Sequence, residues 1–378
     1  MRKTLLIILI AISLIAIVAC KQDPATPTPT PEPDVKSEYT ITFNSNGGSG
    51  TMAEIVVKAG NTAVLTKGCF TQENRLFTGW NTKADYTGDI YTDEGKITPS
   101  TDVTLYAQWV PADFFAVEEG GVLKKGTGFN TNKVTKNLAI PKYIGETTIT
   151  AIKSGTFSGC GLLRKVAIPD SVINLETEAF QNCTGLSDVY MAGSVTAIGD
   201  RTFYGCTVME NLFLSDSLES IGEYAFRACY FVTEIVLPDS VKTIGTGAFE
   251  NCKSLEKITI PATITEVPDW LFSSCSQLKE VTFKGQITSI GASCFNLCSG
   301  LKEFTIPATV TSLGNNCFYG CRDLTSVTVE ATNPPTLTNG TAFNNTNDAP
   351  IYVPSASVDT YKIAETWASY EARIQAKP

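Results

Sequence analysis

Cysteine is the residue type with most scope for chemistry in this sequence of 378 residues, because thiols can pair, hold metals or act as nucleophiles. Eight of them recur at a constant spacing of 23 residues: Cys160, Cys183, Cys206, Cys229, Cys252, Cys275, Cys298 and Cys321. Two more, Cys294 and Cys317, give neighbouring repeats a Cys-x3-Cys spacing that loosely resembles a zinc site.

Packing explains these cysteines better than metal binding or disulfide formation does. Equivalent cysteines on successive repeats have parallel Cβ vectors, which disfavour the torsion of about 90° that a disulfide needs. Cys294 and Cys317 occupy a place that Ala179 and Ala225 hold in other repeats, so small size accounts for them. We therefore expect buried, unpaired thiols and no metal site.

The sequence contains no histidine, which removes the commonest general base and the commonest metal ligand. Nucleophile–histidine catalysis is excluded. Carboxylate pairs such as Glu176 and Glu178 are close in sequence, but nothing indicates a cleft or a raised pKa around them. The sequence predicts neither an enzyme nor a cofactor.

The cysteines belong to a 23-residue repeat with a fixed apolar pattern. A phenylalanine precedes each cysteine of the series by three residues, from Phe157 to Phe318. In the first repeat the remaining apolar places are Leu163, Val166, Ile168, Val172 and Leu175, with Pro169 after the strand. A period of 20–30 residues is typical of solenoids, in which each repeat buries its apolar face against its neighbours.

The repeats resemble the BspA-like leucine-rich repeat family, and residues 244–252 (Ile-Gly-Thr-Gly-Ala-Phe-Glu-Asn-Cys) are a clean instance of its motif. The resemblance covers about residues 140–330. It implies a secreted or surface bacterial protein, since members are linked with adhesion to host proteins and other bacteria. The predicted fold class is mostly β: a leucine-rich-repeat solenoid with a parallel sheet, preceded by a small β-grasp-like domain.

Alternation within the strand of each repeat predicts which side chains face the core. Val166 and Ile168 should point inward, and Lys165 and Ala167 should face solvent. The strands should stack into one continuous parallel sheet. A glycine such as Gly222 recurs after the second apolar pair, where we expect a sharp turn.

The outward strand positions are the candidate binding residues, because packing fixes the inward ones. Three neighbouring repeats carry apolar side chains there, with polar residues beside them: Tyr190, Phe213 and Val236, flanked by Asp188, Asn211 and Glu234. Exposed aromatic side chains in a row favour a contact surface for a partner. Two alternatives are a ladder that only stiffens the sheet and a surface covered by the preceding domain.

Residues 38–110 form a separate predicted domain. Phe43 with Gly47-Gly48, Phe77-Thr-Gly-Trp80 and Leu105-Tyr-Ala-Gln-Trp109 occur in the order of the Listeria–Bacteroides repeat, also called the internalin B-repeat. The resemblance implies a small β-grasp-like module of bacterial surface proteins. We expect Trp80 and Trp109 to be core aromatics and Cys69 to be a free, buried thiol.

Residues 1–20 resemble a bacterial lipoprotein signal peptide. Arg2 and Lys3 precede an apolar run too short for a comfortable membrane span, and Ile17-Val-Ala-Cys20 resembles a lipobox. Cys20 would then carry the acyl chains and anchor the protein in the outer membrane, with the folded part at the surface. The alternative is an ordinary cleaved signal. Residues 21–37, rich in Pro and Thr, are the predicted linker.

The solenoid needs a cap at each end. We assign residues 111–156 to the N-terminal cap, 157–330 to the repeats and 331–378 to the C-terminal cap. The stretch from Ser357 to about Ala376 looks helical. Its expected buried side chains are Tyr361, Trp367, Tyr370 and Ile374.

The net charge of −9 argues against nucleic acid as a partner. Removing Arg2 and Lys3 with the signal leaves 27 basic and 38 acidic residues, a net charge of −11. The sequence thus predicts a non-catalytic surface lipoprotein that binds an extracellular protein or glycan and attaches to host or other cells. The alternative function is a structural scaffold of the envelope, facing the periplasm.

Overall fold

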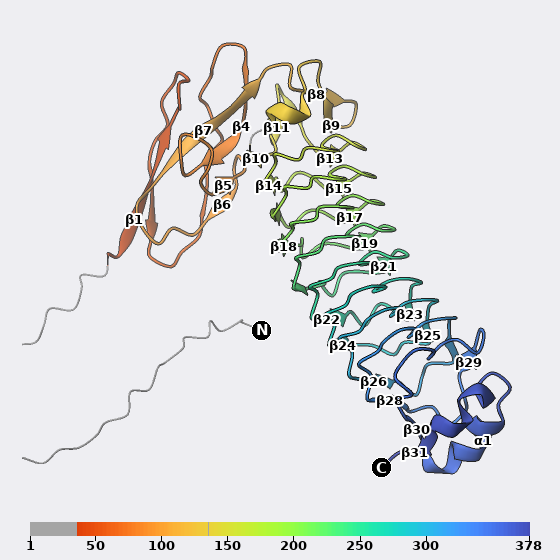
Figure 1. The fold of residues 1–378 in the computed structure, drawn as a ribbon. Helices are drawn as coiled ribbons and strands as arrows, with labels where there is room; N and C mark the ends of the chain where they lie inside the picture. Colours follow the sequence, from red (N-terminus) through yellow and green to blue (C-terminus); the bar gives the residue numbers. More distant parts are fainter. Residues whose placement is uncertain (1–35, 135) are drawn as a thin grey trace, which may run out of the picture. The chain divides into compact units, whose positions relative to one another are not determined.

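The computed structural model describes residues 36–134 and 136–378, and residues 38–378 form one compact unit (Figure 1). The predicted signal peptide, Cys20 and nearly all of the predicted linker lie outside the described residues. Within the described part of the chain, no helix is both long and apolar enough to cross a membrane.

The described chain begins with a small all-β domain. Its main sheet has the strand order β2-β1-β7-β4-β5, in which β1 and β7 run parallel and the other pairs antiparallel. These strands are β1 (Glu38–Asn44), β2 (Ile55–Lys58), β4 (Arg75–Asn81), β5 (Ile90–Tyr91) and β7 (Val103–Pro111). Two further strands, β3 (Ala63–Val64) and β6 (Lys96–Ile97), pair with each other.

Both tryptophans of the domain lie in its core, as the sequence predicted. Trp80 packs against Phe43 and Phe77 with ring centroids 4.8 and 4.9 Å apart, and Trp109 packs against Phe77 at 5.6 Å. Cys69 is unpaired, but the prediction that it is buried was wrong. Its neighbour Phe70 enters the core, so Cys69 points outward, and its thiol donates to the Thr51 carbonyl at 3.3 Å.

Short strands of the N-terminal cap lead into the solenoid. They are β8 (Phe115–Glu118), β9 (Val122–Lys125), β10 (Asn137–Ala139), β11 (Tyr143–Ile144), β12 (Thr147–Thr148) and β13 (Ala151–Ile152), with a 3-10 turn η1 at Thr131–Lys133. The antiparallel hairpin β8–β9 covers the first edge of one solenoid sheet, because β9 pairs in parallel with β13. The edge of β13 is thereby paired with another segment of the same chain and is not left open.

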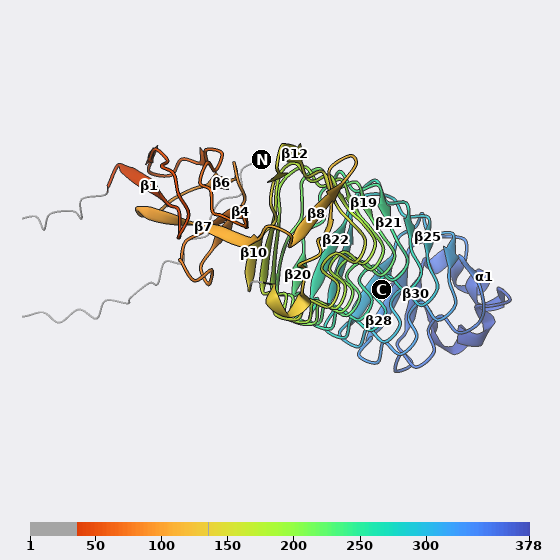
Figure 2. The same ribbon diagram turned by 90° about the horizontal axis from the view of Figure 1, so that it is seen from above.

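Each repeat then supplies a strand to each of two faces, and viewed from above the coils lie over one another (Figure 2). The long-strand face consists of β14 (Lys165–Ile168), β16 (Asp188–Met191), β18 (Asn211–Phe213), β20 (Glu234–Ile235), β22 (Lys257–Ile260), β24 (Glu280–Phe283), β26 (Glu303–Ile306), β28 (Ser326–Val329) and β30 (Ile351–Val353). The short-strand face consists of β15 (Asn174–Leu175), β17 (Ala197–Ile198), β19 (Ser220–Ile221), β21 (Thr243–Ile244), β23 (Glu266–Val267), β25 (Ser289–Ile290), β27 (Ser312–Leu313) and β29 (Thr336–Leu337).

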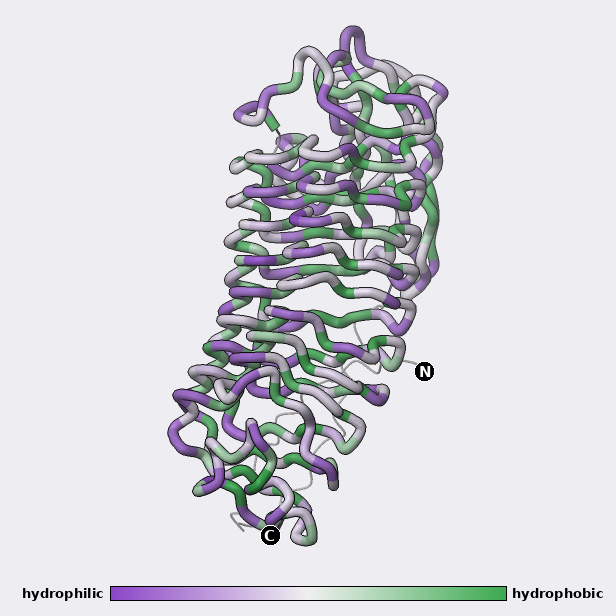
Figure 3. The backbone as a smooth tube through the Cα atoms, turned by 90° about the vertical axis from the view of Figure 1, so that its right-hand side faces the viewer, coloured by the Kyte–Doolittle hydropathy of each residue, from purple (hydrophilic) through white to green (hydrophobic). Residues whose placement is uncertain are grey.

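The prediction of one continuous sheet was wrong: the short-strand ladder is divided between β21 and β23, and the long-strand face is divided twice. Its ladder is divided between β18 and β20 and again between β24 and β26. At the first division β18 has three residues and β20 only two, so few residues are left to pair. The coils nevertheless stay in register along the tube (Figure 3), because the core between the two faces is continuous across both divisions.

The core of the solenoid is organised around an unbroken stack of phenylalanine rings. Neighbouring rings from Phe157 to Phe343 have centroids 4.9 to 5.9 Å apart and lie within 18° of parallel. At the ends the stack meets rings edge-on: Phe115 contacts Phe157 at 5.7 Å, and Tyr370 contacts Phe343 at 5.5 Å. Aromatic side chains of the caps thus close both ends of the stack.

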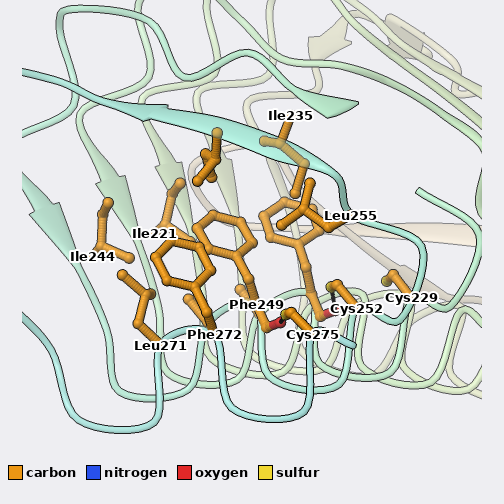
Figure 4. Close-up of a cluster of buried hydrophobic side chains, with 14 of the residues drawn as sticks. Ile221, Cys229, Ile235, Ile244, Phe249, Cys252, Leu255, Leu271, Phe272 and Cys275 are labelled. Atoms are coloured by element: carbon orange, nitrogen blue, oxygen red, sulfur yellow. Dashed lines mark hydrogen bonds between the residues drawn. The ribbon is translucent and has the colours of Figure 1, made fainter. Parts of the chain in front are cut away.

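The cysteine of each repeat forms a hydrogen bond to the neighbouring coil, which the sequence did not reveal. The thiol of Cys275 donates to the carbonyl of Phe249 at 3.2 Å, and Cys252 makes the same contact to Phe226 at 3.3 Å (Figure 4). The same bond recurs from Cys183 to Cys321. Cysteine suits this place because it is small, apolar and still a weak donor.

The recurring glycines are required for close packing rather than for a turn. A Cβ on Gly222 would lie 2.5 Å from the amide nitrogen of Asp200 in the preceding coil. Gly199, Gly245, Gly291 and Gly314 face similar contacts of 2.3 to 2.7 Å, and none of the five has a positive φ.

Other residues adopt the left-handed backbone conformation. They lie two residues before and two after each phenylalanine, and many are not glycine, as with Tyr224 (φ 55°), Ala228 (φ 63°) and Trp270 (φ 60°). Each repeat therefore turns at two left-handed positions, one on either side of its buried ring, and these positions are strained where the residue is not glycine.

The C-terminal cap differs from the single helix that the sequence predicted. It contains a one-turn 3-10 segment η2 (Ser355–Ser357), a short helix α1 (Val358–Ile363), a second 3-10 segment η3 (Ala368–Arg373) and a strand β31 (Ile374–Ala376) that pairs with β30. Tertiary contacts outweigh helix propensity: Tyr361 donates to the Ala331 carbonyl and Trp367 to the Pro335 carbonyl, both at 2.7 Å. The four side chains expected to be buried are buried.

Candidate binding surface

The long-strand face carries two outward rows of side chains. One begins at Ala167 and continues through Tyr190, Phe213 and Val236 to threonines at 259, 282, 305 and 328, because parallel pairing keeps equivalent residues side by side. Only the N-terminal half of this row is apolar. We call Tyr190, Phe213 and Val236 the strip.

The strip is exposed where it lies away from the small domain. The side chains of Phe213 and Val236 are 53% and 59% exposed, which is unusual for residues of their size. Tyr190 is half-buried and stacks on Phe213 with centroids 5.2 Å apart and an angle of 10°. Pairing of β16 with β18 thus pre-orders Tyr190 and Phe213, and Val236 continues the row on the next coil, directly after β20.

The polar row beside the strip is less open than the sequence predicted. Asp188, expected beside the strip at the surface, is only 8% exposed, and its carboxylate accepts hydrogen bonds from Ser187 and, at 2.9 Å, from Asn211. Its charge is therefore used within the fold. Glu234, in contrast, is exposed and pairs with Lys257 at 3.2 Å.

The small domain covers the first repeats of this face, which explains why Ala167 is buried instead of exposed. Strand β5 contacts β14, and the side chain of Asn137 on β10 donates to the Gly88 carbonyl at 2.8 Å. Gln108 of β7 bonds both ways with β10, donating to the Asn137 carbonyl at 3.0 Å and accepting from the Ala139 amide at 3.2 Å. One predicted alternative, a surface covered by the preceding domain, thus holds for the first outward residue and partly for Tyr190.

A nearly buried lysine joins the two parts of the protein. The ammonium group of Lys142 lies 2.8 Å from Glu94 of the small domain and 2.9 Å from Asp170 of the solenoid. Burial alone would lower the pKa of Lys142, but the two carboxylates outweigh it and raise that pKa. Tyr143 also donates to Glu94, at 2.8 Å. These contacts hold β5 close to the solenoid.

A cleft of about 600 Å³ lies between β5 and the long-strand face, at the end of the strip. Asp89 and Tyr91 line it from the small domain, and Asp170, Tyr190 and Gly193 line it from the solenoid. Burial, followed by the nearby carboxylates of Asp188 and Asp89, raises the pKa of Tyr190 to about 12. Its hydroxyl is therefore protonated at neutral pH.

A second aromatic group, half-buried on the turn side of the solenoid, was not found from the sequence. The guanidinium of Arg227 lies 5.4 Å from the ring centre of Tyr204 and 5.6 Å from that of Tyr224. The same arginine pairs with Glu250 at 2.9 Å. The guanidinium of Arg227 is already paired with two tyrosine rings and a carboxylate. The arrangement therefore favours a role in stiffening the fold over ligand binding.

The cysteine ladder offers no reactive site. Burial raises the pKa of its thiols, to about 12 for Cys252, so the nucleophilic thiolate is disfavoured. No group of three or more Cys, Asp or Glu residues in the described part of the chain is arranged to hold a metal ion.

Repeats of fixed length that stack into parallel ladders around a phenylalanine core define a leucine-rich-repeat solenoid. The sequence matches the BspA type leucine rich repeat region in six copies, over residues 129–231 and 219–350. The chain therefore belongs to the BspA-type leucine-rich repeat family. Residues 39–108 match the Listeria-Bacteroides repeat domain.

Several solved structures are similar to the solenoid. A leucine-rich repeat protein from Bacteroides ovatus is 24% identical, with 63% of this chain and 69% of that chain covered and a TM-score of 0.49. The leucine-rich repeat protein of T. pallidum is 25% identical, with 51% and 90% covered and a TM-score of 0.46. A leucine rich cell surface protein from Faecalibacterium prausnitzii is 18% identical, with 70% and 96% covered and a TM-score of 0.26. No curated protein matches the sequence.

Proposed function

We propose that the protein is a non-catalytic surface lipoprotein whose strip binds a protein on host cells or on other bacteria. The observation that carries this function is the exposure of Phe213 and Val236 at equivalent places of neighbouring coils. Apolar side chains held rigidly at the surface lose little conformational entropy on binding and form the usual centre of a protein interface.

The flanking residues fit such an interface. Asn211 and Glu234 are exposed beside the strip and can form the polar rim that surrounds an apolar centre. Asp188 acts through Asn211, whose side chain it orients. The threonine row further along the same face is polar and flat, so it offers no comparable anchor.

Replacing the two exposed side chains of the strip with threonine, the residue that occupies the same row further along the solenoid, tests the function. The double variant Phe213→Thr, Val236→Thr puts a β-branched residue at each place, as the rest of the row has, and should fold normally. Residues 38–378 would be measured for attachment to an epithelial cell layer and to intact cells of other bacteria. We expect attachment to weaken by about tenfold or more, since central anchors dominate binding.

The matched control is Thr282→Ala, Thr305→Ala, which changes the same row away from the strip and should leave attachment unchanged. A double strip variant that attaches like the unmodified chain would refute the proposed surface. Circular dichroism and thermal unfolding of all variants separate loss of binding from loss of folding.

The anchor and the location rest on the sequence of residues 1–20. Cys20 would be lipid-modified and hold the protein in the outer membrane with residues 38–378 outside the cell. In living cells, Cys20→Ala should abolish incorporation of labelled palmitate. Protease added to intact cells should degrade the solenoid; complete protection would instead support the periplasmic scaffold.

A further inference from the structure

The cleft between β5 and the long-strand face has the size of a small-ligand site. Its volume of about 600 Å³ lies within the range of roughly 300–1,000 Å³ that small-molecule sites occupy. Its walls come from two parts of the chain that are distant in sequence: Ile90 and Tyr91 on one side, Ile168 and Tyr190 on the other. Neither the small domain nor the solenoid forms this site alone.

The repeat beside the cleft departs from the others where the cleft is formed. Ala192-Gly193 stands where the preceding repeat has Pro169-Asp170 and a later repeat has Pro238-Asp239. A Cβ on Gly193 would meet no atom within 4 Å, although other glycines of the solenoid, such as Gly222, are tightly packed. Gly193 therefore leaves open space at the wall of the cleft.

The cleft combines aromatic, apolar and charge-compensated polar groups. The side chains of Asp89 and Asp170 are 71% and 54% exposed, and each has a lysine partner, Lys165 at 3.7 Å and Lys142 at 2.9 Å. Their oxygens can thus accept hydrogen bonds without presenting a strong net charge. Tyr190 supplies a hydroxyl that stays protonated at neutral pH.

We propose that this cleft binds a neutral saccharide of one or two sugar rings. A sugar ring has an apolar face that packs on tyrosine and a rim of hydroxyls that donate to carboxylates. The tyrosines Tyr91 and Tyr190 and the carboxylates Asp89 and Asp170 present these two kinds of group together. A cationic ligand would compete with Lys142 and Lys165, and an anionic one would be repelled by the carboxylates.

An extended peptide is a poorer fit. Strand β5 has only two residues, so it offers few backbone groups to which a peptide strand could add. The cleft can hold a saccharide whether or not the strip has a protein partner.

The test is saturation-transfer NMR and calorimetry on residues 38–378 with maltose, cellobiose and lactose as neutral probes. Sialyllactose and a lysine-rich peptide serve as anionic and cationic probes. We expect at least one neutral disaccharide to bind. Tyr91→Ala and Gly193→Trp should each raise its Kd by about tenfold or more. Gly193→Trp places an indole in the open space and should not disturb the backbone.

Two controls keep the outcome interpretable. Gly193→Ala adds only a methyl group and should retain binding, and the strip variant Phe213→Thr, Val236→Thr should bind the sugar as before. Absence of binding by every neutral probe, preference for a charged probe, or unchanged binding by Gly193→Trp would overturn the saccharide site. Loss of cell attachment with intact sugar binding would separate the strip from the cleft.

Discussion

The inside and the outside of the same 23-residue repeat follow different rules. Inside, phenylalanine and cysteine recur without exception from the first repeat to the eighth, because each ring packs on the next and each thiol from Cys183 onward donates to a carbonyl of the preceding coil. Outside, the equivalent row changes from aromatic at Tyr190 and Phe213 to threonine from residue 259 onward. The difference shows that packing requires the same residue types inside every repeat, while the residue types of the outward rows can differ from one repeat to the next.

The largest expected contrast is the response of the interior thiols to alkaline pH. Ten cysteines of the described residues are buried in the solenoid, and burial raises their pKa, to about 12 for Cys252 and Cys321. Unfolded thiols ionise near pH 8.5 to 9. The folded state therefore keeps protons that the unfolded state loses, so the free energy of unfolding should fall as pH rises above about 9.

Each ionising thiol contributes about 1.4 kcal/mol per pH unit to this loss, so ten together should unfold the protein within one or two pH units. Urea unfolding under reducing conditions at pH 7.5, 9 and 10 measures the slope. The variant Cys252→Ala, Cys275→Ala should show a shallower slope. A midpoint that stays constant up to pH 10 would contradict the prediction.

Removing one ring of the stack should have the next largest effect. Phe249 is fully buried between Phe226 and Phe272, at 5.7 and 5.9 Å, so Phe249→Ala leaves a cavity in the continuous core. We expect a loss of about 3–5 kcal/mol in the free energy of unfolding. The exposed Phe213→Thr should change it by less than about 0.5 kcal/mol. Similar losses for the two variants would remove the distinction between inside and outside.

Adding one methyl group at each of two glycines, one tightly packed and one in open space, tests the same comparison on a smaller scale. Gly222→Ala places a Cβ 2.5 Å from a backbone nitrogen of the preceding coil, and we expect it to destabilise the protein by about 1–3 kcal/mol. Gly193→Ala enters open space and should be close to neutral. Thermal unfolding of the two single variants decides this. Equal melting temperatures would mean that the coils can move apart at little cost.

The smallest expected effect is a gain. Ala228 has a φ of 63°, a left-handed conformation that costs an alanine roughly 1–2 kcal/mol and that glycine adopts freely. We expect Ala228→Gly to stabilise the protein by about 0.5–1 kcal/mol, less than the strain itself because glycine gains entropy when unfolded. Its counterpart Gly205→Ala, at φ 72°, should destabilise it. A lower denaturant midpoint for Ala228→Gly together with a higher one for Gly205→Ala would show that Ala228 is not strained.

The repeat lattice made much of this architecture predictable. The spacing of Phe157, Cys160 and their equivalents requires stacked coils, since no single repeat can bury its ring and its branched side chains. The same lattice identified the outward row, and Phe213 and Val236 are exposed as that row predicted. Gly222 was recognised as special, but its cause, close packing against the preceding coil, depends on a neighbour 22 residues away.

The left-handed turns at Tyr224 and Ala228 could not be predicted, because neither residue type favours a positive φ. Cys69 was misplaced because an irregular segment has no period from which to infer its direction. The single helix expected over residues 357–376 is instead divided into α1 and η3 and ends in the strand β31, which pairs with β30, a partner that local propensity does not include.

By itself the sequence determined the solenoid, the stacked core and the row on which the strip lies, because these follow from a period and from local alternation. Only the tertiary structure decided that Ala167 is covered, that Asp188 is bonded to Asn211, and that Tyr91 and Tyr190 face one cleft. The bond between Asp188 and Asn211 depends on the pairing of β16 with β18, and the other two features depend on where the small domain packs against the solenoid. That packing rests on single contacts such as Lys142 with Glu94, which repeat nowhere in the sequence and so leave no pattern to read.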